Sequence, residues 1–361
     1  MEAVKQKMIH FAENGLYATV QHTAGTDVFV NVTCAVQNDS DERAEVWVDL
    51  HMHQLIDNGK EQMDEEPGIK AAGAVKLEIA PHTSGNAQTQ ICVEDAVLWN
   101  LDKPILYVVE GVLYGAVAEG EALPNPRLLA GMALCAPHAM KMLDFAETHF
   151  GMRTVTVDAK NGLRINGMAV KLKGDGACST KEASFERQYQ AVRTYRDRGN
   201  NAICVKSSLA SDAFLECCSR LGVVVLVVAE ALEDIRRHQN LPAVIAWLEG
   251  VLTAEDIRAK DAVRVIGGIC DSGYGMDEAD SFSPEKWLEG TETICAGWSM
   301  TGCPKEYTAY RQAHALFPNR VMFVVTEKPE TVWDTVEKHP YLIGALAYEK
   351  IRKTPKILLT R

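Results

Sequence analysis

The stretch RVMFVVTEKPETVWDTVEKHPYLIGALAYE, residues 320–349, decides how this chain folds. An apolar run (321–326) is followed by Glu327, by a helical segment that Pro329 opens, and by a second apolar run (341–347). Nearly continuous apolar runs are expected of strands that are covered on both faces of a parallel sheet. A carboxylate directly after such a strand, with a helix behind it, is typical of the catalytic end of an α/β barrel.

The same alternation of strand and helix fills the second half of the chain. Eight apolar segments qualify as parallel strands: 170–176, 201–207, 223–231, 243–250, 263–271, 294–302, 321–327 and 341–349. Helix start signals stand between them, namely Ser184, Ser211, Thr253 with Asp256, and Ser283 before a proline. Alternating βα units of this number predict a (β/α)8 TIM barrel, which at about 190 residues is compact and has short loops.

The first half of the chain follows a period of two. Its alternating segments cover residues 27–38, 44–55, 75–81, 87–93 and 105–115. Short strands at this spacing predict an immunoglobulin-like β-sandwich. We therefore expect a multidomain β plus α/β protein, with a sandwich over residues 1–150 and a reduced barrel over residues 151–361. Residues 116–144 read as an insertion in the sandwich.

The composition argues against several classes of partner. The formal net charge of -12 disfavours nucleic acid, whose phosphates attract Lys and Arg patches, and it equally disfavours an anionic membrane surface. Residues 1–16 contain no apolar core of signal-peptide length, and no later run approaches the length of a membrane span. The ten cysteines are scattered, and Cys217 and Cys218 are adjacent, so we expect reduced thiols in a cytoplasmic protein.

The sequence predicts no cofactor and no metal. Cys178, Cys270 and Cys303 each follow a predicted barrel strand, but no Cys-x-x-Cys spacing supports a metal site. His51 and His53 share one face of a strand, and an exposed sheet face is the simpler reason for them. The Gly-rich segment 267–275 lacks the glycine spacing and the Lys-Ser/Thr pair of a phosphate-binding loop.

Three segments resemble family 2 glycoside hydrolases, the family of β-galactosidase and β-glucuronidase. VLWNLDKPILYVVEGVLY (97–114) is similar to the end of the family's sandwich domain, and HFGMRTVTVDAKNGLRINGMAVKLKG (149–174) is similar to its passage into the first barrel strand. The Thr-Glu at Glu327 resembles the family's nucleophile, and the turn at 337–341 resembles the one before its last strand. The resemblance implies a retaining β-glycosidase fold, here without the jelly-roll domain that precedes the sandwich in the family.

The resemblance also implies a gap in the catalytic pair. Retaining β-glycosidases need two carboxyl groups about 5–5.5 Å apart, and the family takes them from the ends of its fourth and seventh strands. Glu327 fills the nucleophile position, but in NLPAVIAWLEGVLT (240–253) the acid/base position falls on Leu252, which cannot donate a proton. Glu249 lies three residues earlier and would substitute only through a local bulge, because strand alternation aims it differently.

Other polar positions of the family's active face have changed as well. Cys204 and Ser207 stand where the family's second strand has Arg and His. The positions that the resemblance still places at substrate are Glu230, Trp247, Trp298 and Tyr348. Without its polar surroundings, Glu327 is either a functional carboxylate or a relic that pairs with Lys206 or Lys328.

Three hypotheses follow. The one that we favour is a pseudoenzyme, a homologue of these hydrolases that has lost conventional catalysis and has a carbohydrate-related binding or assembly role. The second is an active retaining β-glycosidase with Glu327 as its nucleophile and Glu249, Glu230 or a substrate-borne acid as its partner. The third is a subunit, in a homo-oligomer or with a different partner subunit, whose open barrel face another chain completes.

Overall fold

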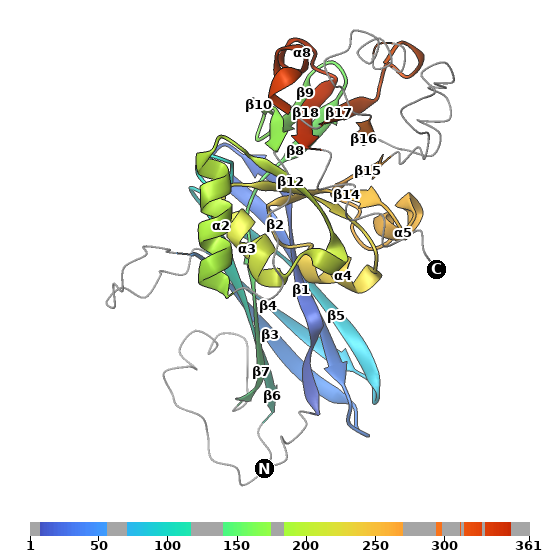
Figure 1. Cartoon of the computed structure of the whole chain (residues 1–361). Helices are drawn as coiled ribbons and strands as arrows, with labels where there is room; N and C mark the ends of the chain where they lie inside the picture. The colour runs from blue at the N-terminus through green and yellow to red at the C-terminus, as the bar shows by residue number, and fades with distance from the viewer. Residues whose placement is uncertain are drawn as a thin grey trace. The chain divides into compact units, whose positions relative to one another are not determined.

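A computed structural model describes residues 8–55, 71–116, 140–174, 184–269, 294–297, 311, 314–326 and 329–347. The chain divides into two compact units, which are described separately (Figure 1). Unit 1 comprises Met1–Val97 and Ile105–Met152, and unit 2 comprises Leu98–Pro104 and Arg153–Arg361. The segment Leu98–Pro104 therefore interrupts unit 1 in sequence but belongs to unit 2.

The described part of unit 1 consists of antiparallel strands in two sheets. These strands are β1 (Ile9–Ala24), β2 (Asp27–Asn38), β3 (Ala44–Gln54), β4 (Ala71–Ile79), β5 (Thr83–Val93), β6 (Tyr107–Ala116) and β7 (Met140–Phe150). One sheet has the order β1-β2-β5 and the other has the order β4-β3-β6-β7. The two-sheet arrangement agrees with the predicted sandwich, and its immunoglobulin type stays a prediction.

The strands of unit 1 form where the sequence alternates. Every second residue of β2 is buried, so Val30, Val32 and Val36 point into the core. At the end of β2, the buried amide of Asn38 donates to the carbonyl of Glu42 at 2.8 Å and accepts from the backbone N–H of Ser40 at 3.0 Å. These bonds fix the turn that leads into β3.

One boundary in unit 1 differs from the prediction. β7 begins at Met140 and pairs with β6, with Met140 opposite Ala116. Residues 140–144, which the sequence places in the insertion, are therefore part of a sheet. The sequence does not reveal this, because charged and apolar residues in this segment do not alternate clearly. Residues 117–139 of the insertion lie outside the described residues.

The centre of unit 2 is a parallel sheet of eight strands. They are β11 (Leu172–Gly174), β12 (Ala202–Lys206), β13 (Val224–Val228), β14 (Val244–Glu249), β15 (Val265–Ile269), β16 (Ile294–Gly297), β17 (Val321–Thr326) and β18 (Leu342–Ala347). Their order is β11-β18-β17-β16-β15-β14-β13-β12. Every predicted strand is present in this sheet. Within the described residues no strand ladder joins β11 to β12, so a closed barrel stays a prediction.

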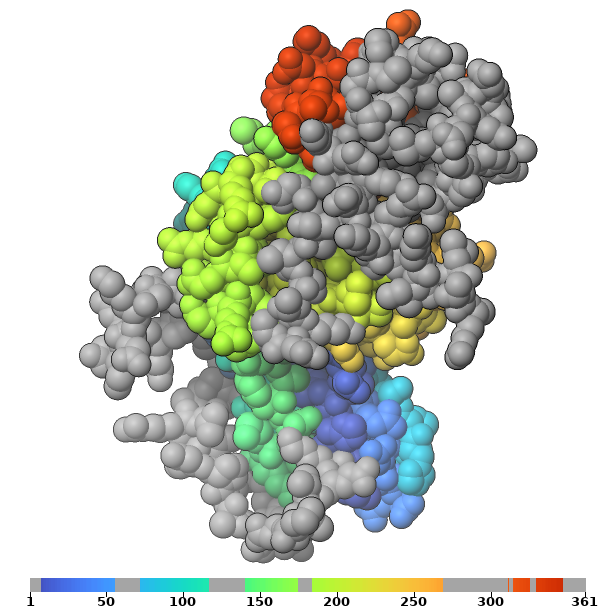
Figure 2. Space-filling view, viewed as in Figure 1, coloured from blue at the N-terminus to red at the C-terminus, as the bar shows by residue number. Residues whose placement is uncertain are grey.

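Helices and a small sheet complete the described part of unit 2. The helical elements are α2 (Phe185–Asp197), η1 (Ser207–Leu209), α3 (Asp212–Leu221), α4 (Leu232–His238), α5 (Ala254–Arg258), η2 (Pro329–Thr331) and α8 (Trp333–Lys338). The small antiparallel sheet contains β8 (Val155–Asp158), β9 (Gly162–Ile165) and β10 (Met168–Val170). The yellow-green α2 lies on the surface of unit 2 (Figure 2). None of the helices in the described ranges has the length and apolar character that a bilayer crossing requires.

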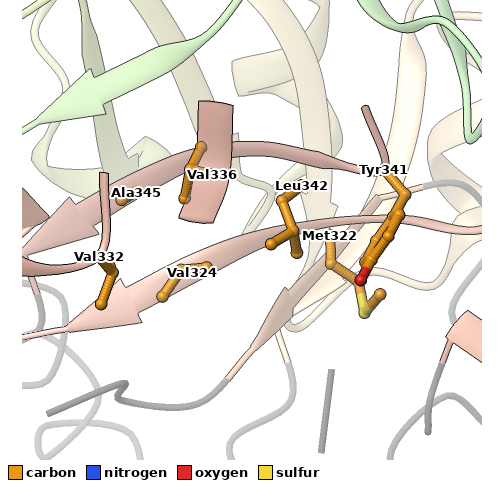
Figure 3. Packing of buried hydrophobic residues seen from close by; sticks show 7 residues of the cluster. All are labelled: Met322, Val324, Val332, Val336, Tyr341, Leu342 and Ala345. Carbon is orange, nitrogen blue, oxygen red and sulfur yellow. The ribbon is translucent and has the colours of Figure 1, made fainter. Parts of the chain in front are cut away.

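The parallel strands β12 and β13 are buried on both faces of the sheet. Every residue of β12 and β13 is buried, which explains their continuous apolar sequences. At β17 and β18, seven buried residues form one cluster: Met322, Val324, Val332, Val336, Tyr341, Leu342 and Ala345. Figure 3 shows Val332, which lies between η2 and α8, and Val336 of α8 beside the two strands, with Tyr341 next to Met322. This packing holds the segment that follows the expected nucleophile position.

Local signals in the sequence place several helix ends as predicted. The hydroxyl of Ser211 accepts from the N–H of Phe214 at 3.2 Å at the start of α3. Thr253 and Asp256 form the predicted capping box of α5. Ser184 occupies the N-cap position of α2, and Ser283 lies outside the described residues.

The segment Leu98–Pro104 is fixed to α2 and α3. The indole of Trp99 is fully buried and donates to the carbonyl of Ser219 at 2.8 Å. Arg196 donates to the carbonyl of Leu101 at 2.9 Å. Gly222 ends α3 with a φ of 67°, and a Cβ there would lie 2.2 Å from the same carbonyl oxygen. Only glycine combines this left-handed conformation with this close approach.

Candidate functional site

The carboxyl ends of the parallel strands lie on one edge of the sheet, which we call the carboxyl edge. Its described part comprises the residues that follow β12, β13 and β14, namely Ser207–Leu209, 229–230 and 250–252. Three candidate site residues, Glu327, Trp298 and Tyr348, lie outside the described residues. The same is true of Lys328 and of Cys178, Cys270 and Cys303.

Glu230 is held by a small polar network at the ends of β12 and β13. One carboxylate oxygen lies 3.4 Å from the ammonium of Lys206, and the other accepts from the N–H of Ser208 at 3.0 Å. The N–H of Glu230 donates to the hydroxyl of Ser207 at 3.2 Å, and this hydroxyl donates to Asp234 at 2.6 Å. The side chains of Lys206 and Glu230 are only 9% and 14% exposed. The network therefore binds both loops together and orients Glu230.

Glu249 is used at the start of α5. It is the last residue of β14, and its carboxylate accepts from the N–H of Ala254 at 2.9 Å. This contact satisfies one of the backbone donors that a helix start leaves open. The side chain is partly exposed. A substrate that approached it would either share the carboxylate with the N–H of Ala254 or displace that contact.

The expected acid/base position lies in a tight turn. The N–H of Leu252 donates to the carbonyl of Ala229 at 3.4 Å, and the N–H of Gly250 donates to the carbonyl of Leu252 at 3.3 Å. A Cβ on Gly250 would lie 2.7 Å from Cγ1 of Val228, so the turn fits closely against the end of β13. Val251 is 62% exposed and Leu252 is half-buried. The turn therefore presents hydrocarbon at this position, with no group that can donate a proton.

Trp247 has a structural environment. Its side chain is fully buried, and its indole N–H donates to Asp261 at 2.9 Å. Asp261 lies in the connection from α5 to β15, so the indole is directed toward the opposite, amino-terminal edge of the sheet. As it stands, Trp247 offers no surface to a ligand at the carboxyl edge.

The site where the resemblance implies an arginine is neutral. Cys204 is buried in β12, and burial raises the pKa of its thiol to about 12. The thiol therefore stays protonated at neutral pH and carries no charge. Among the described residues of this edge, Lys206, two residues later on the same strand, carries a positive charge.

Sequence reasoning missed Asp234 and the pairing of Lys206 with Glu230 in the network at the carboxyl edge. Lys206 was considered as a partner of Glu327, and the structure pairs it with Glu230. Asp234 was not singled out, because nothing in a short helix start distinguishes a capping carboxylate from one that reaches a neighbouring loop. A usable signal was present at Lys206, since a lysine that ends an otherwise apolar buried strand needs a partner. Among the described residues, no group of three His, Cys, Asp or Glu side chains is arranged to hold a metal ion.

Comparison with known proteins shows which proteins this chain resembles. No protein-family model matches the sequence. A β-galactosidase of Bacteroides ovatus is 22% identical over 226 residues, which cover 60% of this chain and 22% of that protein. The crystal structure of a glycosyl hydrolase family 2 member from Bacteroides cellulosilyticus matches 94% of this chain with a TM-score of 0.71 and 18% identity. The chain has the fold of family 2 glycoside hydrolases.

A second solved structure supports the same conclusion about the fold. A β-glucuronidase of Bacteroides uniformis also matches 94% of the chain, with a TM-score of 0.71 and 15% identity. The matches cover 44% and 46% of the two solved chains. This chain therefore spans about half of the length of these structures and about a fifth of the length of the curated β-galactosidase. The likeness to family 2 glycoside hydrolases predicted from residues 97–114, 149–174 and 320–349 is confirmed.

Proposed function

We propose that this chain is a family 2 glycoside hydrolase homologue with impaired catalysis, which binds carbohydrate or serves in assembly through its carboxyl edge. The observation that supports the proposal is the turn at Gly250–Leu252, where Val251 and Leu252 present hydrocarbon at the position that the resemblance assigns to the acid/base. The two described carboxylates nearby support it, because Glu230 is bound to Lys206 and Ser208 and Glu249 is bound to Ala254. Glu327 keeps the nucleophile position in the sequence.

The proposal includes a closed (β/α)8 barrel in unit 2. The N–H of Asn201 donates to the carbonyl of Lys173 at 2.9 Å, and its side-chain oxygen accepts from the N–H of Lys173 at 2.7 Å. A Cβ on Gly174 would lie 2.3 Å from the carbonyl oxygen of Ala202. These contacts bring β11 and β12 together in the place where the strand order requires closure. The proposal also includes an immunoglobulin-like domain over residues 1–150 and a reduced barrel over residues 151–361.

Buried cysteines in both units favour a reducing, cytoplasmic compartment. Cys34, Cys204, Cys217 and Cys218 are buried and are not joined in disulfides among the described residues. Burial raises the pKa of Cys217 to about 12 and that of Cys34 to about 11, so both are protonated and unreactive at neutral pH. The proposal also includes substrate contacts from Trp298 and Tyr348. It further includes association with a second copy or a partner subunit, and binding experiments test both points.

A panel of nitrophenyl β-glycosides tests whether turnover is lost. Aryl leaving groups depart without much help from an acid, so a surviving nucleophile would give a burst of nitrophenol. We expect no steady turnover and no burst. A burst that Glu327→Gln abolishes and Glu249→Gln preserves would support an active glycosidase with Glu327 as its nucleophile, and would contradict the proposal.

A gain-of-function variant makes the test sharper. Leu252→Glu places a carboxyl group where the resemblance expects the acid/base, and Val251→Glu places the same group one residue away on the exposed side of the turn. If the missing acid alone limits catalysis, Leu252→Glu gains hydrolysis of substrates with poor leaving groups and Val251→Glu does not. Equal inactivity of both variants, together with measurable sugar binding by calorimetry, would favour a binding role.

A further inference from the structure

The sheet β1-β2-β5 of unit 1 has an outer face without charged side chains over three successive rows of residues (Figure 1). Strand register aligns Tyr17, Thr33 and Gln88 in one row and Thr19, Asn31 and Gln90 in the next. The third row consists of His22, Phe29 and Cys92. The β2 residues between these rows are buried in the core, so the rows point away from it. We call the three rows the neutral face.

The neutral face combines stacked rings with amide and hydroxyl groups. The ring of His22 stacks on that of Phe29 with 4.3 Å between centroids and 11° between planes. His22 is exposed and Phe29 is half-buried, so part of this flat surface is open to a ligand. Beside it, the amide of Gln90 donates across β2 to the amide oxygen of Gln21. The face therefore offers apolar ring surface next to neutral donors and acceptors.

The outer face of the other sheet in unit 1 is charged. It carries Glu45 and Asp49 on β3, Lys76 on β4, Glu110 on β6 and Glu147 on β7. Glu45 and Lys76 form an ion pair at 2.9 Å. Soluble proteins ordinarily intersperse charges of both signs over their surface. In a chain with a net charge of -12, composition alone does not explain why one face of the same unit lacks charge.

An uncharged carbohydrate polymer matches the chemistry of the neutral face. Its hydroxyl groups can donate to and accept from amides and hydroxyls, and the CH faces of sugar rings pack on flat aromatic surfaces. A charged side chain that faced such a polymer would lose hydration without gaining a counter-ion. Nucleic acids and anionic membranes instead require cations. The three rows measure about 10 Å across the strands and about 14 Å along them, which accommodates a short run of sugar units.

We infer that the neutral face is a binding surface for an uncharged polysaccharide. It belongs to unit 1, whereas the carboxyl edge belongs to unit 2, and the inference does not rest on the proposed function. A flat, exposed face covers only one side of each sugar unit. We therefore expect weak binding that repeats along a polymer, because several equivalent stretches of one chain can engage the same face in turn.

Affinity electrophoresis of the full chain in native gels tests the inference. We expect retardation in gels that contain hydroxyethylcellulose or galactomannan, which are neutral, and none in carboxymethylcellulose, which has the cellulose backbone with negative charge. Gln90→Glu places a carboxylate in the middle row and should weaken binding about tenfold. Gln190→Glu makes the same exchange on the exposed side of α2 and should bind as the parent does.

Two further measurements locate the polymer on the chain. His22→Ala removes an exposed ring and should weaken binding less than Gln90→Glu does, because Phe29 remains. The thiol of Cys92 lies in the neutral face and is exposed, so hydroxyethylcellulose should slow its alkylation by iodoacetamide, measured by mass spectrometry of the peptide. Circular dichroism and thermal melts establish that each variant is folded.

Several results would overturn the inference. These are the absence of retardation by either neutral polymer, equal retardation by carboxymethylcellulose, and equal weakening in Gln190→Glu. Retardation that Glu230→Gln abolishes and Gln90→Glu preserves would assign the polymer to the carboxyl edge, which contradicts this inference and leaves the proposed function standing. Self-association that Gln90→Glu abolishes, without retardation by a neutral polymer, would identify a second copy of the chain as the occupant.

Discussion

The acidic side chains at the two edges of the parallel sheet in unit 2 differ in how completely they are hydrogen-bonded. At the amino-terminal edge, Asp261 is fully buried and accepts from the indole of Trp247, the guanidinium of Arg264 at 2.7 Å, and the backbone N–H groups of Val263 and Arg264. At the carboxyl edge, Glu230 is bound more loosely, with 3.4 Å to Lys206.

The difference shows which edge is built for stability. Arg264 also donates to the carbonyls of Val244 and Leu241, so the whole Asp261 network is saturated and ties β14 to β15. Its members have no capacity left for a ligand. The groups at the carboxyl edge keep lone pairs that a ligand could use, because two or fewer donors reach each of Glu230 and Glu249 within the described residues. These lone pairs support the proposed placement of the binding site at the carboxyl edge.

The largest effect is expected from Asp261→Asn. The substitution keeps the shape but leaves the buried charge of Arg264 without its counter-ion, which should lower the free energy of unfolding by about 3–5 kcal/mol. Urea denaturation followed by tryptophan fluorescence measures the change. Asp256→Asn, in the exposed capping box of α5, is the matched control and should cost much less. Comparable losses in the two variants would remove the contrast between the edges.

The loss of stability at acid pH should depend on the same carboxylate, that of Asp261. Burial alone would raise the pKa of Asp261, but the charge of Arg264 and the hydrogen bonds from Trp247 and Arg264 outweigh it and hold the pKa below its ordinary value. Stability from a lowered carboxylate pKa is fully present above the unfolded-state pKa of about 3.9 and is lost as the pH falls through the folded-state value. Unfolding measured between about pH 6 and pH 2 should show this loss, and Asp261→Asn should flatten it.

A smaller effect is expected from Trp247→Phe. The variant keeps a buried aromatic ring but removes the N–H donor and part of the ring volume, while Arg264 and Val263 continue to satisfy Asp261. We expect a loss of about 1–2 kcal/mol and no change in sugar affinity. Denaturation and sugar titration on the same preparation separate the two properties. A folded variant with weakened sugar binding would return Trp247 to the substrate site.

At the carboxyl edge, the effects of Lys206→Met and Glu230→Gln on the free energy of unfolding should be nearly additive. Glutamine retains an acceptor for the N–H of Ser208, and the ion pair spans 3.4 Å, so the double-mutant cycle should give a coupling energy of about 1 kcal/mol or less. A coupling of about 3 kcal/mol or more would make this pair as structural as the Asp261 network.

An effect of similar size is expected at the start of α5, where Glu249 and Thr253 both accept from backbone N–H groups. Thr253→Ala removes the hydroxyl that accepts from the N–H of Asp256 at 3.2 Å, which should cost about 1 kcal/mol, whereas Thr253→Asp restores an N-cap acceptor. Thermal denaturation resolves the two variants. If Thr253→Ala also changes reactivity toward nitrophenyl glycosides, Glu249 takes part in chemistry through the start of α5.

Much of the fold could be predicted from the sequence because its signals are local. Continuous apolar runs identified all eight parallel strands, and the capping residues Ser211 and Thr253 identified two helix starts. β7 was hidden in part, because residues 140–144 lack clear alternation. The sequence predicts residues 1–150 as the sandwich, but Leu98–Pro104 belongs to unit 2, where Trp99 donates to Ser219 of α3. No local pattern shows which neighbour a buried indole will contact.

By itself, the sequence determined the order of elements and the family likeness, and it predicted a leucine at residue 252 in place of the family's acid, since these depend on residue type and spacing along the chain. Only the tertiary structure decided which charged groups meet. Lys206 pairs with Glu230, Glu249 turns to α5, and Trp247 turns to Asp261, because strand register and loop closure bring together residues that are far apart in the sequence. The interaction of two charges depends on their distance in space, and sequence spacing does not fix that distance.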